Sequence, residues 1–206
     1  MKIYGGNVSG RDKIDFFKKR GWGTMVTGTK YITPKEIDFA VDNGAFVSWK
    51  KGEEWDSNEF VKSIEKIVRL NLRPDFIVLP DIVAGGLDSL GLSSSWIVRV
   101  PSPKYLAVQD GMEMHLDKID REFMNRIEGL FVGGTMKWKL KTGEFWVNVA
   151  KRMKIKCHIA RVGTFKRLLW ARRIGADSVD STTYIQNWKT INGKSKLENY
   201  ENMTCL

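Results

Sequence analysis

Cysteine and long apolar segments are scarce in this 206-residue sequence, and their scarcity excludes several classes of protein. The two cysteines, Cys157 and Cys205, cannot form a disulfide framework or a CxxC metal site, which favours a reducing, cytoplasmic setting. No run of about 18 apolar residues is present, so we expect no membrane partner. The N-terminal residues lack the apolar core of a signal peptide and look like the start of a folded domain.

Acidic residues are also scarce, but only in the last third of the chain. Residues 136–196 hold 15 Lys and Arg against three acidic residues, whereas residues 1–135 hold 19 of each kind. Solvated helix faces would account for this excess, and so would a basic surface that attracts phosphates. On the second interpretation, the candidate contacts to a nucleic acid are Lys137, Lys139, Arg161, Lys166, Arg167, Tyr184 and Trp188. Core packing is the alternative for Tyr184 and Trp188.

Linkers and internal repeats are absent, so we expect one domain over residues 1–206. Short runs rich in Val, Ile, Phe and Tyr predict strands at 2–4, 24–27, 37–42, 75–80, 104–109, 129–132, 156–160 and 177–180. Helices are expected at 58–72, 139–153 and 164–174. This alternation indicates an α/β fold, and eight units predict a compact (β/α)8 TIM-type barrel. An open doubly wound sheet is the alternative, and the unit at 24–34 is the weakest of the eight.

Polar residues follow the predicted strands at their C-terminal ends. The groups that end successive strands are Asp42, Asp81, Gln109 with Asp110, the pair Gly133 and Gly134, and Asp180. TIM-barrel enzymes build their active sites at this end, so we expect these groups to converge on one mouth. Any single Asp after a strand is more often a helix cap or a turn residue, and the interpretation therefore depends on their joint occurrence. Carboxylates that share a poorly solvated mouth would shift each other's pKa values.

Four short motifs carry a resemblance to a known family. They are Asp-Asn-Gly-Ala-Phe at 42–46, Val-Gln-Asp-Gly at 108–111, Gly-Leu-Phe-Val-Gly-Gly at 129–134, and Gly-Ala-Asp-Ser-Val-Asp at 175–180. In this order they resemble the Asp-Ser-Gly-Gly-Phe, Val-Gln-Gly-Gly and Gly-Leu-Ala-Val-Gly segments and the nucleophile strand of the tRNA-guanine transglycosylase superfamily. The similarity spans about residues 40–185. The family's zinc site is absent, since only Cys205 follows Asp180, and the chain is short; it therefore resembles the reduced transglycosylase-like proteins of phages and DNA-modification systems.

The resemblance implies a covalent base exchange in which Asp180 and Asp42 are the catalytic residues. Asp180 would attack C1′ of a guanosine nucleotide, and Asp42 would move protons on the leaving and entering bases. Asp81 would accept from N1–H and the 2-amino group, while Gln109 and the Gly134 N–H would address O6. The other residues of the implied base pocket are Asn43, Gly44, Phe46 and Gly133. The resemblance implies neither a metal nor an organic cofactor.

The implied partners are a nucleic acid, with DNA favoured over tRNA, and a free 7-deazaguanine base. A homodimer is left open, and the resemblance fits a phage-encoded protein that acts in the host cytoplasm. Two other functions remain as alternatives. One is an N-glycosidase or glycoside hydrolase that uses Asp42 and Asp180 with water as the acceptor; the other is a non-catalytic nucleic-acid-binding subunit. His158 is expected to pack within its strand, on the face opposite to Cys157.

Overall fold

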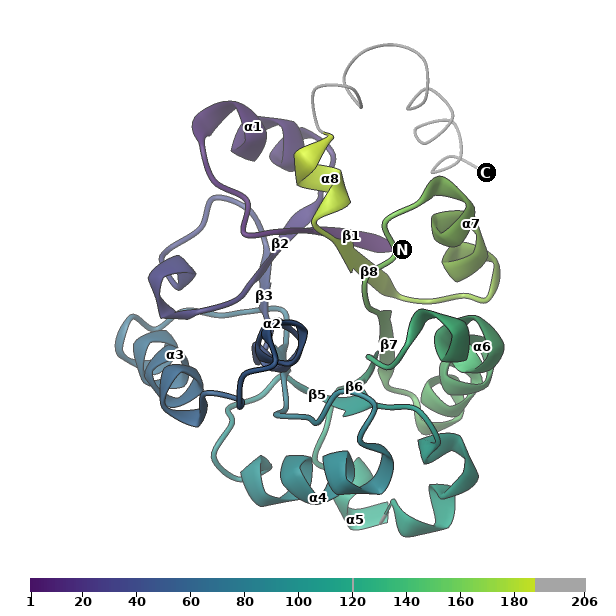
Figure 1. Ribbon diagram of the computed structural model, residues 1–206. Helices are drawn as coiled ribbons and strands as arrows, with labels where there is room; N and C mark the ends of the chain where they lie inside the picture. The colour runs from purple at the N-terminus through teal and green to yellow at the C-terminus, as the bar shows by residue number, and fades with distance from the viewer. Residues whose placement is uncertain (120, 188–206) are drawn as a thin grey trace.

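The computed structural model describes residues 1–119 and 121–187, and in this part of the chain the strands close into a barrel (Figure 1). The strands are β1 (Lys2–Gly6), β2 (Gly23–Val26), β3 (Phe39–Val41), β4 (Ile77–Val78), β5 (Lys104–Val108), β6 (Gly129–Val132), β7 (Lys156–Ile159) and β8 (Ser178–Ser181). All neighbours are parallel and follow sequence order, and β8 pairs with β1 to close the ring. The predicted (β/α)8 TIM-type barrel is therefore confirmed, and the open sheet is wrong.

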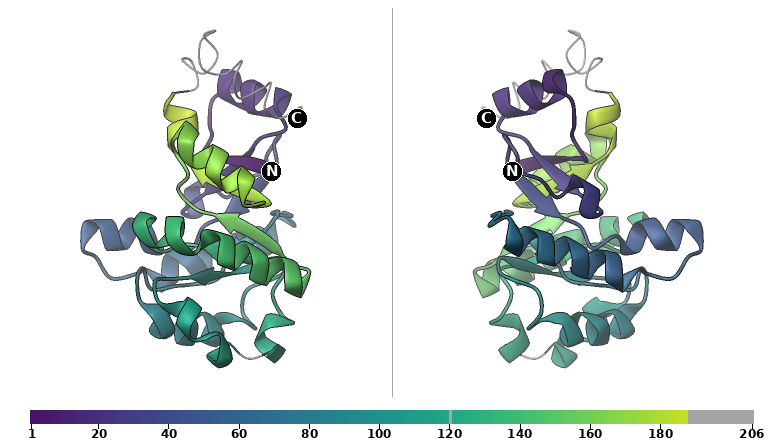
Figure 2. Two further views of the ribbon diagram at one scale, coloured as in Figure 1. Left: turned by 90° about the vertical axis from the view of Figure 1, so that its right-hand side faces the viewer. Right: turned by 90° about the vertical axis from the view of Figure 1, so that its left-hand side faces the viewer.

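Helices surround the ring of strands (Figure 1). They are α1 (Arg11–Lys19), α2 (Ala45–Lys51), α3 (Ser57–Arg69), α4 (Gly86–Trp96), α5 (Arg121–Met124), α6 (Met136–Met153), α7 (Phe165–Arg173) and α8 (Thr183–Gln186). Three short 3-10 turns add η1 (Thr29–Tyr31), η2 (Met112–Met114) and η3 (Leu116–Lys118). In the side views, α2 stands out from one end of the barrel (Figure 2). Among the described residues, no helix has the length and apolar character needed to cross a bilayer.

The three predicted helices each begin directly after a residue whose side chain caps the helix N-terminus. The side chain of Asp56 accepts the N–H of Glu59 at 3.0 Å and starts α3. Thr135 and Thr164 cap α6 and α7 in the same way, so α6 begins three residues earlier than predicted. The weak second unit contains β2, but the connection to β3 holds only the short turn η1 where other units carry a longer helix. Its weak sequence pattern therefore reflects a real shortening.

Side chains on the inner face of the strands fill the barrel with a layer of aromatic and aliphatic groups. Its buried members are Tyr4, Met25, Ala40, Phe76, Val78, Tyr105 and Ala107, with Phe131 packed against them. The rings of Phe76 and Tyr105 stack with centroids 4.1 Å apart. A larger apolar core lies between the outer face of the strands and the helices. The inner layer thus forms the floor beneath the carboxyl ends of the strands, where the polar groups gather.

Candidate active site

Polar side chains from several strand ends line a cavity of about 360 Å³ at the C-terminal end of the barrel. This volume lies within the usual range for small-molecule sites. The wall brings together the predicted residues Asp42, Asp81, Gln109 and Asp180, which lie far apart in sequence. The other predicted residues on the wall are Asn43, Phe46, Gly133, Gly134 and Arg161. The expected convergence on one mouth is therefore present in the fold.

Asp180 reaches the cavity because it lies on the inward face of β8, two residues after Ser178. Its side chain is 15% exposed. Its Oδ1 accepts the backbone N–H of Arg161 at 3.0 Å and lies 3.0 Å from Nε2 of His158. Burial alone would raise the pKa of Asp180, but the His158 contact and the Arg161 N–H outweigh it and hold the pKa below its ordinary value. Asp180 is therefore an ionised carboxylate at neutral pH.

Asp42 follows β3 directly and has the opposite electrostatic setting. The hydroxyl of Thr27 donates to its Oδ2 at 3.2 Å. Burial, and then the negative charges of Asp180 and Asp81, raise the pKa of Asp42 to about 7. At neutral pH this carboxyl group is populated in both protonation states, which is the property that a general acid and base requires.

Asp81 is 7% exposed and is held by two amide side chains. Asn43 donates from Nδ2 to its Oδ1 at 2.6 Å, and Gln109 donates from Nε2 to its Oδ2. Burial raises the pKa of Asp81 to about 6, although both amides favour the ionised form. The second N–H of Asn43 donates to the carbonyl of Leu79 at 2.7 Å. Asn43 therefore positions Asp81 and has no N–H left to donate to a ligand.

The carboxamide of Gln109 is fixed on its oxygen side as well. Its Oε1 accepts the N–H of Ala84 at 3.0 Å and that of Gly134 at 2.9 Å. The Gly134 N–H, which was expected to address a base, is thus used by Gln109. Gly133 lacks a side chain for a clear reason, because a Cβ there would collide with the Gln109 amide. In the described part of the chain, the second N–H on Nε2 of Gln109 has no partner and is open to a ligand.

Arg161 crosses the cavity and does not belong to the outer basic surface. Its Nη2 donates to the carbonyl oxygen of Gly133 at 3.1 Å and to that of Gly134. Its guanidinium carbon lies 3.9 Å from the ring centroid of Phe46. Phe46 stacks in turn on Trp49, with centroids 5.7 Å apart, and Trp49 is 55% exposed. A continuous stack therefore runs from the cavity wall to solvent along α2.

His158 is the site residue that sequence reasoning missed, although it packs within β7 as expected. Its Nδ1 lies 2.9 Å from the Ser178 hydroxyl, and its Nε2 contacts Asp180. The pairing register places His158 beside Ser178. The ring can therefore reach Asp180, the next residue of β8 that points into the barrel. Burial lowers the pKa of His158, which keeps the ring neutral at neutral pH. Cys157 belongs to the outer core, on the opposite face.

Two predicted nucleic-acid contacts are wrong. Lys139 is fully buried, and its ammonium group donates to the carbonyl of Ala160 at 2.5 Å, so it cannot meet a phosphate at the surface. Tyr184 is 2% exposed and its hydroxyl donates to the carbonyl of Val162, so core packing holds for this residue. Trp188 lies outside the described residues.

Other predicted residues lie near the mouth but not on the cavity wall. Lys137 and Lys166 are exposed and Arg167 is half-buried, in the first turns of α6 and α7. Gly44 precedes α2 with a φ of 84° and shapes the turn between Asp42 and that helix. Asp110 accepts the backbone N–H and the hydroxyl of Thr135 at 2.7 and 2.6 Å, and it therefore supports the start of α6.

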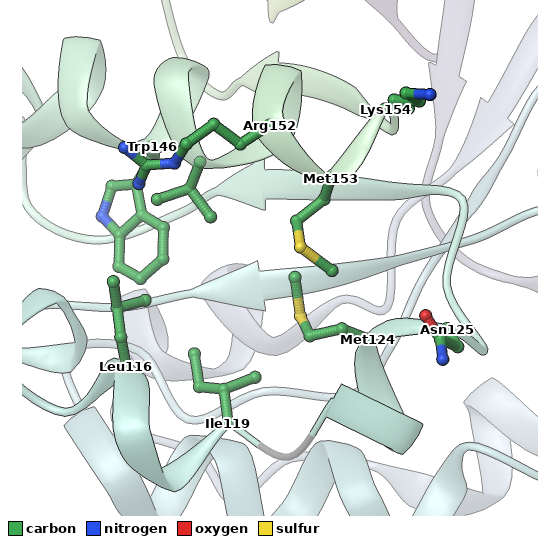
Figure 3. A pocket seen from close by; sticks show the side chains of 9 residues that line it. Leu116, Ile119, Met124, Asn125, Trp146, Arg152, Met153 and Lys154 are labelled. Atoms are coloured by element: carbon green, nitrogen blue, oxygen red, sulfur yellow. The ribbon is translucent and has the colours of Figure 1, made fainter.

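A second cavity, of about 470 Å³, lies outside the barrel between α6 and the segment 116–125 (Figure 3). Its walls are chiefly apolar; Met124 and Met153 face each other, and Leu116 points toward Trp146 (Figure 3). Its polar lining side chains are Asn125, Arg152 and Lys154, with the indole of Trp146, and none of the described residues on its wall carries a carboxylate. Although it is larger, this cavity does not bring together a carboxylate pair like that of Asp42 and Asp180 among its described lining residues.

The function of the Asp180 cavity is not indicated by a metal site among the described residues or by a match to a protein family or curated protein. Among the described residues, no group of three His, Cys, Asp or Glu side chains is placed to hold a metal ion. No protein-family model matches the chain, and no curated protein matches it significantly. The functional argument therefore depends on the chemistry of the cavity itself.

Proposed function

We propose that the protein exchanges a nucleobase in a nucleic acid, replacing guanine with a 7-deazaguanine base through a covalent intermediate on Asp180. One observation carries the proposal: an ionised buried carboxylate, Asp180, shares a cavity wall with Asp42, whose pKa is about 7. A nucleophile and a proton carrier with separated pKa values are what a double displacement requires. The resemblance of residues 40–185 to tRNA-guanine transglycosylases supports guanine as the base that leaves.

In the first step, a carboxylate oxygen of Asp180 attacks C1′ of the target nucleotide and the bond from C1′ to N9 breaks. Asp42 in its protonated form gives its proton to N9, so guanine leaves as a neutral base. The sugar develops oxocarbenium character in the transition state, which a neighbouring carboxylate stabilises. The product is a glycosyl ester on Asp180 and an ionised Asp42.

In the second step, the entering 7-deazaguanine loses its N9 proton to Asp42 and attacks C1′, which releases the Asp180 carboxylate. The ester no longer carries the charge of Asp180, and that charge is one of the causes of the raised pKa of Asp42. The pKa of Asp42 therefore falls in the intermediate, which keeps Asp42 ionised and ready to accept a proton. Atoms and protons balance over the two steps without a cofactor.

Asp81 and Gln109 provide the polar edge that would recognise the base. Each Asp81 oxygen accepts one amide N–H and has a lone pair left for N1–H or the 2-amino group of a guanine. Gln109 has one N–H left for O6. Phe46 offers an aromatic face on the same wall, against which Arg161 packs in this structure.

The polymer would be bound by a basic and an aromatic part of the rim. Lys137, Lys166 and Arg167 lie in the first turns of α6 and α7, at the cavity end of the barrel. A groove beside α7 is lined by Lys166, Arg167 and Arg173 together with the aromatic ring of Trp170. Trp49 on α2 is exposed and suited to stacking on a neighbouring base. The target base must leave its stack to enter the cavity, so a flipped or single-stranded nucleotide is expected.

Incubation with labelled guanine and guanine-containing DNA or RNA tests the proposal. Incorporation of label into either polymer supports exchange, and comparison of the two polymers shows which one is the substrate. Release of guanine without incorporation would mean that water is the acceptor, as in an N-glycosidase. Neither release nor incorporation, with intact binding, would leave the non-catalytic subunit as the better description.

Replacement of Asp180 by Asn tests the nucleophile. Asp180→Asn should abolish label incorporation while polymer binding stays within about twofold, because the amide is isosteric but not nucleophilic. The matched control is Asp110→Asn, which changes a carboxylate at the end of β5 that does not line the cavity. Exchange that survives in Asp180→Asn would show that another group forms the covalent bond.

A further inference from the structure

The ring of His158 lies among the aromatic and aliphatic side chains of the inner layer. It is fully buried and stacks on Phe131, with centroids 4.9 Å apart and planes 3° from parallel. The rings of Phe76 and Tyr4 also lie against the His158 ring, with centroids 5.2 and 5.9 Å from its centroid. Packing alone would be satisfied by a phenylalanine of similar shape. Both ring nitrogens, however, have polar partners, so the ring is oriented by hydrogen bonds at its two ends.

The charge state of Asp180 fixes the direction of these hydrogen bonds. An ionised carboxylate can only accept, so the proton of the neutral imidazole lies on Nε2 and points at Oδ1 of Asp180. Nδ1 is then an acceptor, and the hydroxyl of Ser178 donates to it. The hydrogen bond from Ser178 therefore favours the tautomer in which Nε2–H donates to Asp180.

The two oxygens of Asp180 are not equivalent as a result. Oδ1 accepts both the Nε2–H of His158 and the backbone N–H of Arg161, each at 3.0 Å. Oδ2 accepts no hydrogen bond within the described part of the chain. Donors withdraw electron density from Oδ1 and fix the plane of the carboxylate, which leaves Oδ2 as the better nucleophile.

We infer that His158 is a positioning residue. Oriented by Ser178, the His158 ring holds Oδ1 of Asp180 through a hydrogen bond, so that Oδ2 is the oxygen that bonds to C1′. This inference rests on the proposed function. When Oδ2 attacks, Oδ1 becomes the carbonyl oxygen of the ester and keeps both donors. When the entering base displaces the ester, negative charge returns to the carboxylate, and the same two donors stabilise it as the leaving group. His158 thus acts on both steps without touching the substrate.

Other charged groups around the ring do not replace this role. Lys139 on α6 faces the same region and disfavours a second positive charge on His158, which agrees with a neutral ring. Tyr4 on β1 directs its hydroxyl to Asp75 at 2.7 Å, away from the site. The remaining neighbours, Phe76 and Phe131, carry no charge. The hydrogen bond from His158 to Asp180 is therefore the polar link that a substitution can remove selectively.

Two substitutions of His158 separate positioning from packing. His158→Phe keeps the ring but removes the donor, and His158→Gln keeps a side-chain N–H that can reach Asp180. We expect His158→Phe to slow guanine release about tenfold to a hundredfold and to move the acid limb of the pH–rate profile upward by one unit or more, with unchanged KM for the polymer. His158→Gln should recover a large part of the rate and return the acid limb toward that of the wild type. Tyr105→Phe, which alters the same interior layer without touching Asp180, serves as the control.

A direct titration keeps this inference separable from the proposed function. The carboxyl carbon of Asp180 can be followed by NMR in protein labelled with ¹³C-aspartate, assigned with Asp180→Asn. The inference requires a lower pKa of Asp180 in the wild type and His158→Gln than in His158→Phe, whether or not bases are exchanged. An acid limb and a carboxyl titration that stay in place in folded His158→Phe would overturn the positioning role. Should His158→Phe not fold, His158→Leu takes its place, because leucine also lacks a donor, and an Asp180 titration that stays in place in folded His158→Leu would overturn the role.

Discussion

Replacement of Thr27 by valine tests whether Asp42 carries the proton. Thr27→Val keeps the branched shape and removes the hydroxyl that donates to Oδ2 of Asp42 at 3.2 Å. A hydrogen bond to a charged acceptor is worth about 1.5 kcal/mol at the weaker end of the range, and the length of this bond places it there. Because the bond favours the ionised form, its loss should raise the pKa of Asp42 by about one unit. The starting value is about 7, so the change falls within an accessible pH range.

The assay is the pH dependence of guanine release in a single turnover without an entering base. Asp42 must be protonated in this step, so the rate falls as the pH rises through its pKa of about 7. In Thr27→Val the midpoint should lie about one unit higher, and the variant should be several-fold faster than the wild type at alkaline pH. Thr27→Ser keeps the hydroxyl and should keep the wild-type midpoint. A midpoint unmoved in Thr27→Val would refute the assignment of Asp42 as the titrating acid.

Two further predictions concern the basic rim and the interior. In a salt titration by fluorescence anisotropy, the double variant Lys166→Ala, Arg167→Ala should weaken polymer binding and reduce the slope of log affinity against log salt by about 1 to 2, whereas Trp49→Ala should weaken binding without changing the slope. The control is Lys151→Ala, Arg152→Ala, at the far end of α6. Equal slopes in all variants would contradict a phosphate contact. Burial lowers the pKa of Lys139 to about 7. Between this pH and about 10.5 the unfolded chain therefore binds one more proton than the folded protein. The free energy of unfolding should rise with pH in this window, by about 2 kcal/mol from pH 7 to 9. Urea unfolding should show that rise in the wild type beyond the rise in Lys139→Met, and parallel curves would contradict it.

The barrel could be predicted from the sequence because its signals are local. Each strand is a short run of β-branched and aromatic residues, and each is buried on both faces, so the runs need no knowledge of their neighbours to be recognised. Asp42, Asp81 and Asp180 could be placed on one rim for the same reason, since every parallel strand of a barrel ends at the same side. The starts of α3 and α7 depend on equally local signals, because each is capped by the side chain at one position, Asp56 or Thr164.

What escaped prediction depends on register and side-chain direction. His158 contacts Asp180 because β7 and β8 pair with His158 opposite Ser178, and a single sequence does not contain that register. The basic stretch around Lys139 predicts a surface cation, yet its position on α6 faces the barrel. Arg161 has a φ of 59°, and this left-handed conformation accompanies a side chain that lies across the cavity, away from the outer surface.

Three carboxyl groups share one poorly solvated cavity, and the hydrogen-bond donors and charges around each of them decide which is ionised. Asp180 contacts the His158 ring and a backbone N–H at one oxygen, and its pKa is lowered. Asp81 accepts hydrogen bonds from two neutral amides and has a pKa of about 6. Asp42 accepts one from the Thr27 hydroxyl and lies near the negative charges of Asp180 and Asp81, and its pKa is about 7. Burial favours the neutral form of all three, so the lowered pKa of Asp180 requires its hydrogen-bond donors and the nearby Lys139. The order follows from groups on β7 and just after β2, β3, β5 and β7, and in the proposed mechanism it distinguishes the nucleophile from the acid before any substrate is bound.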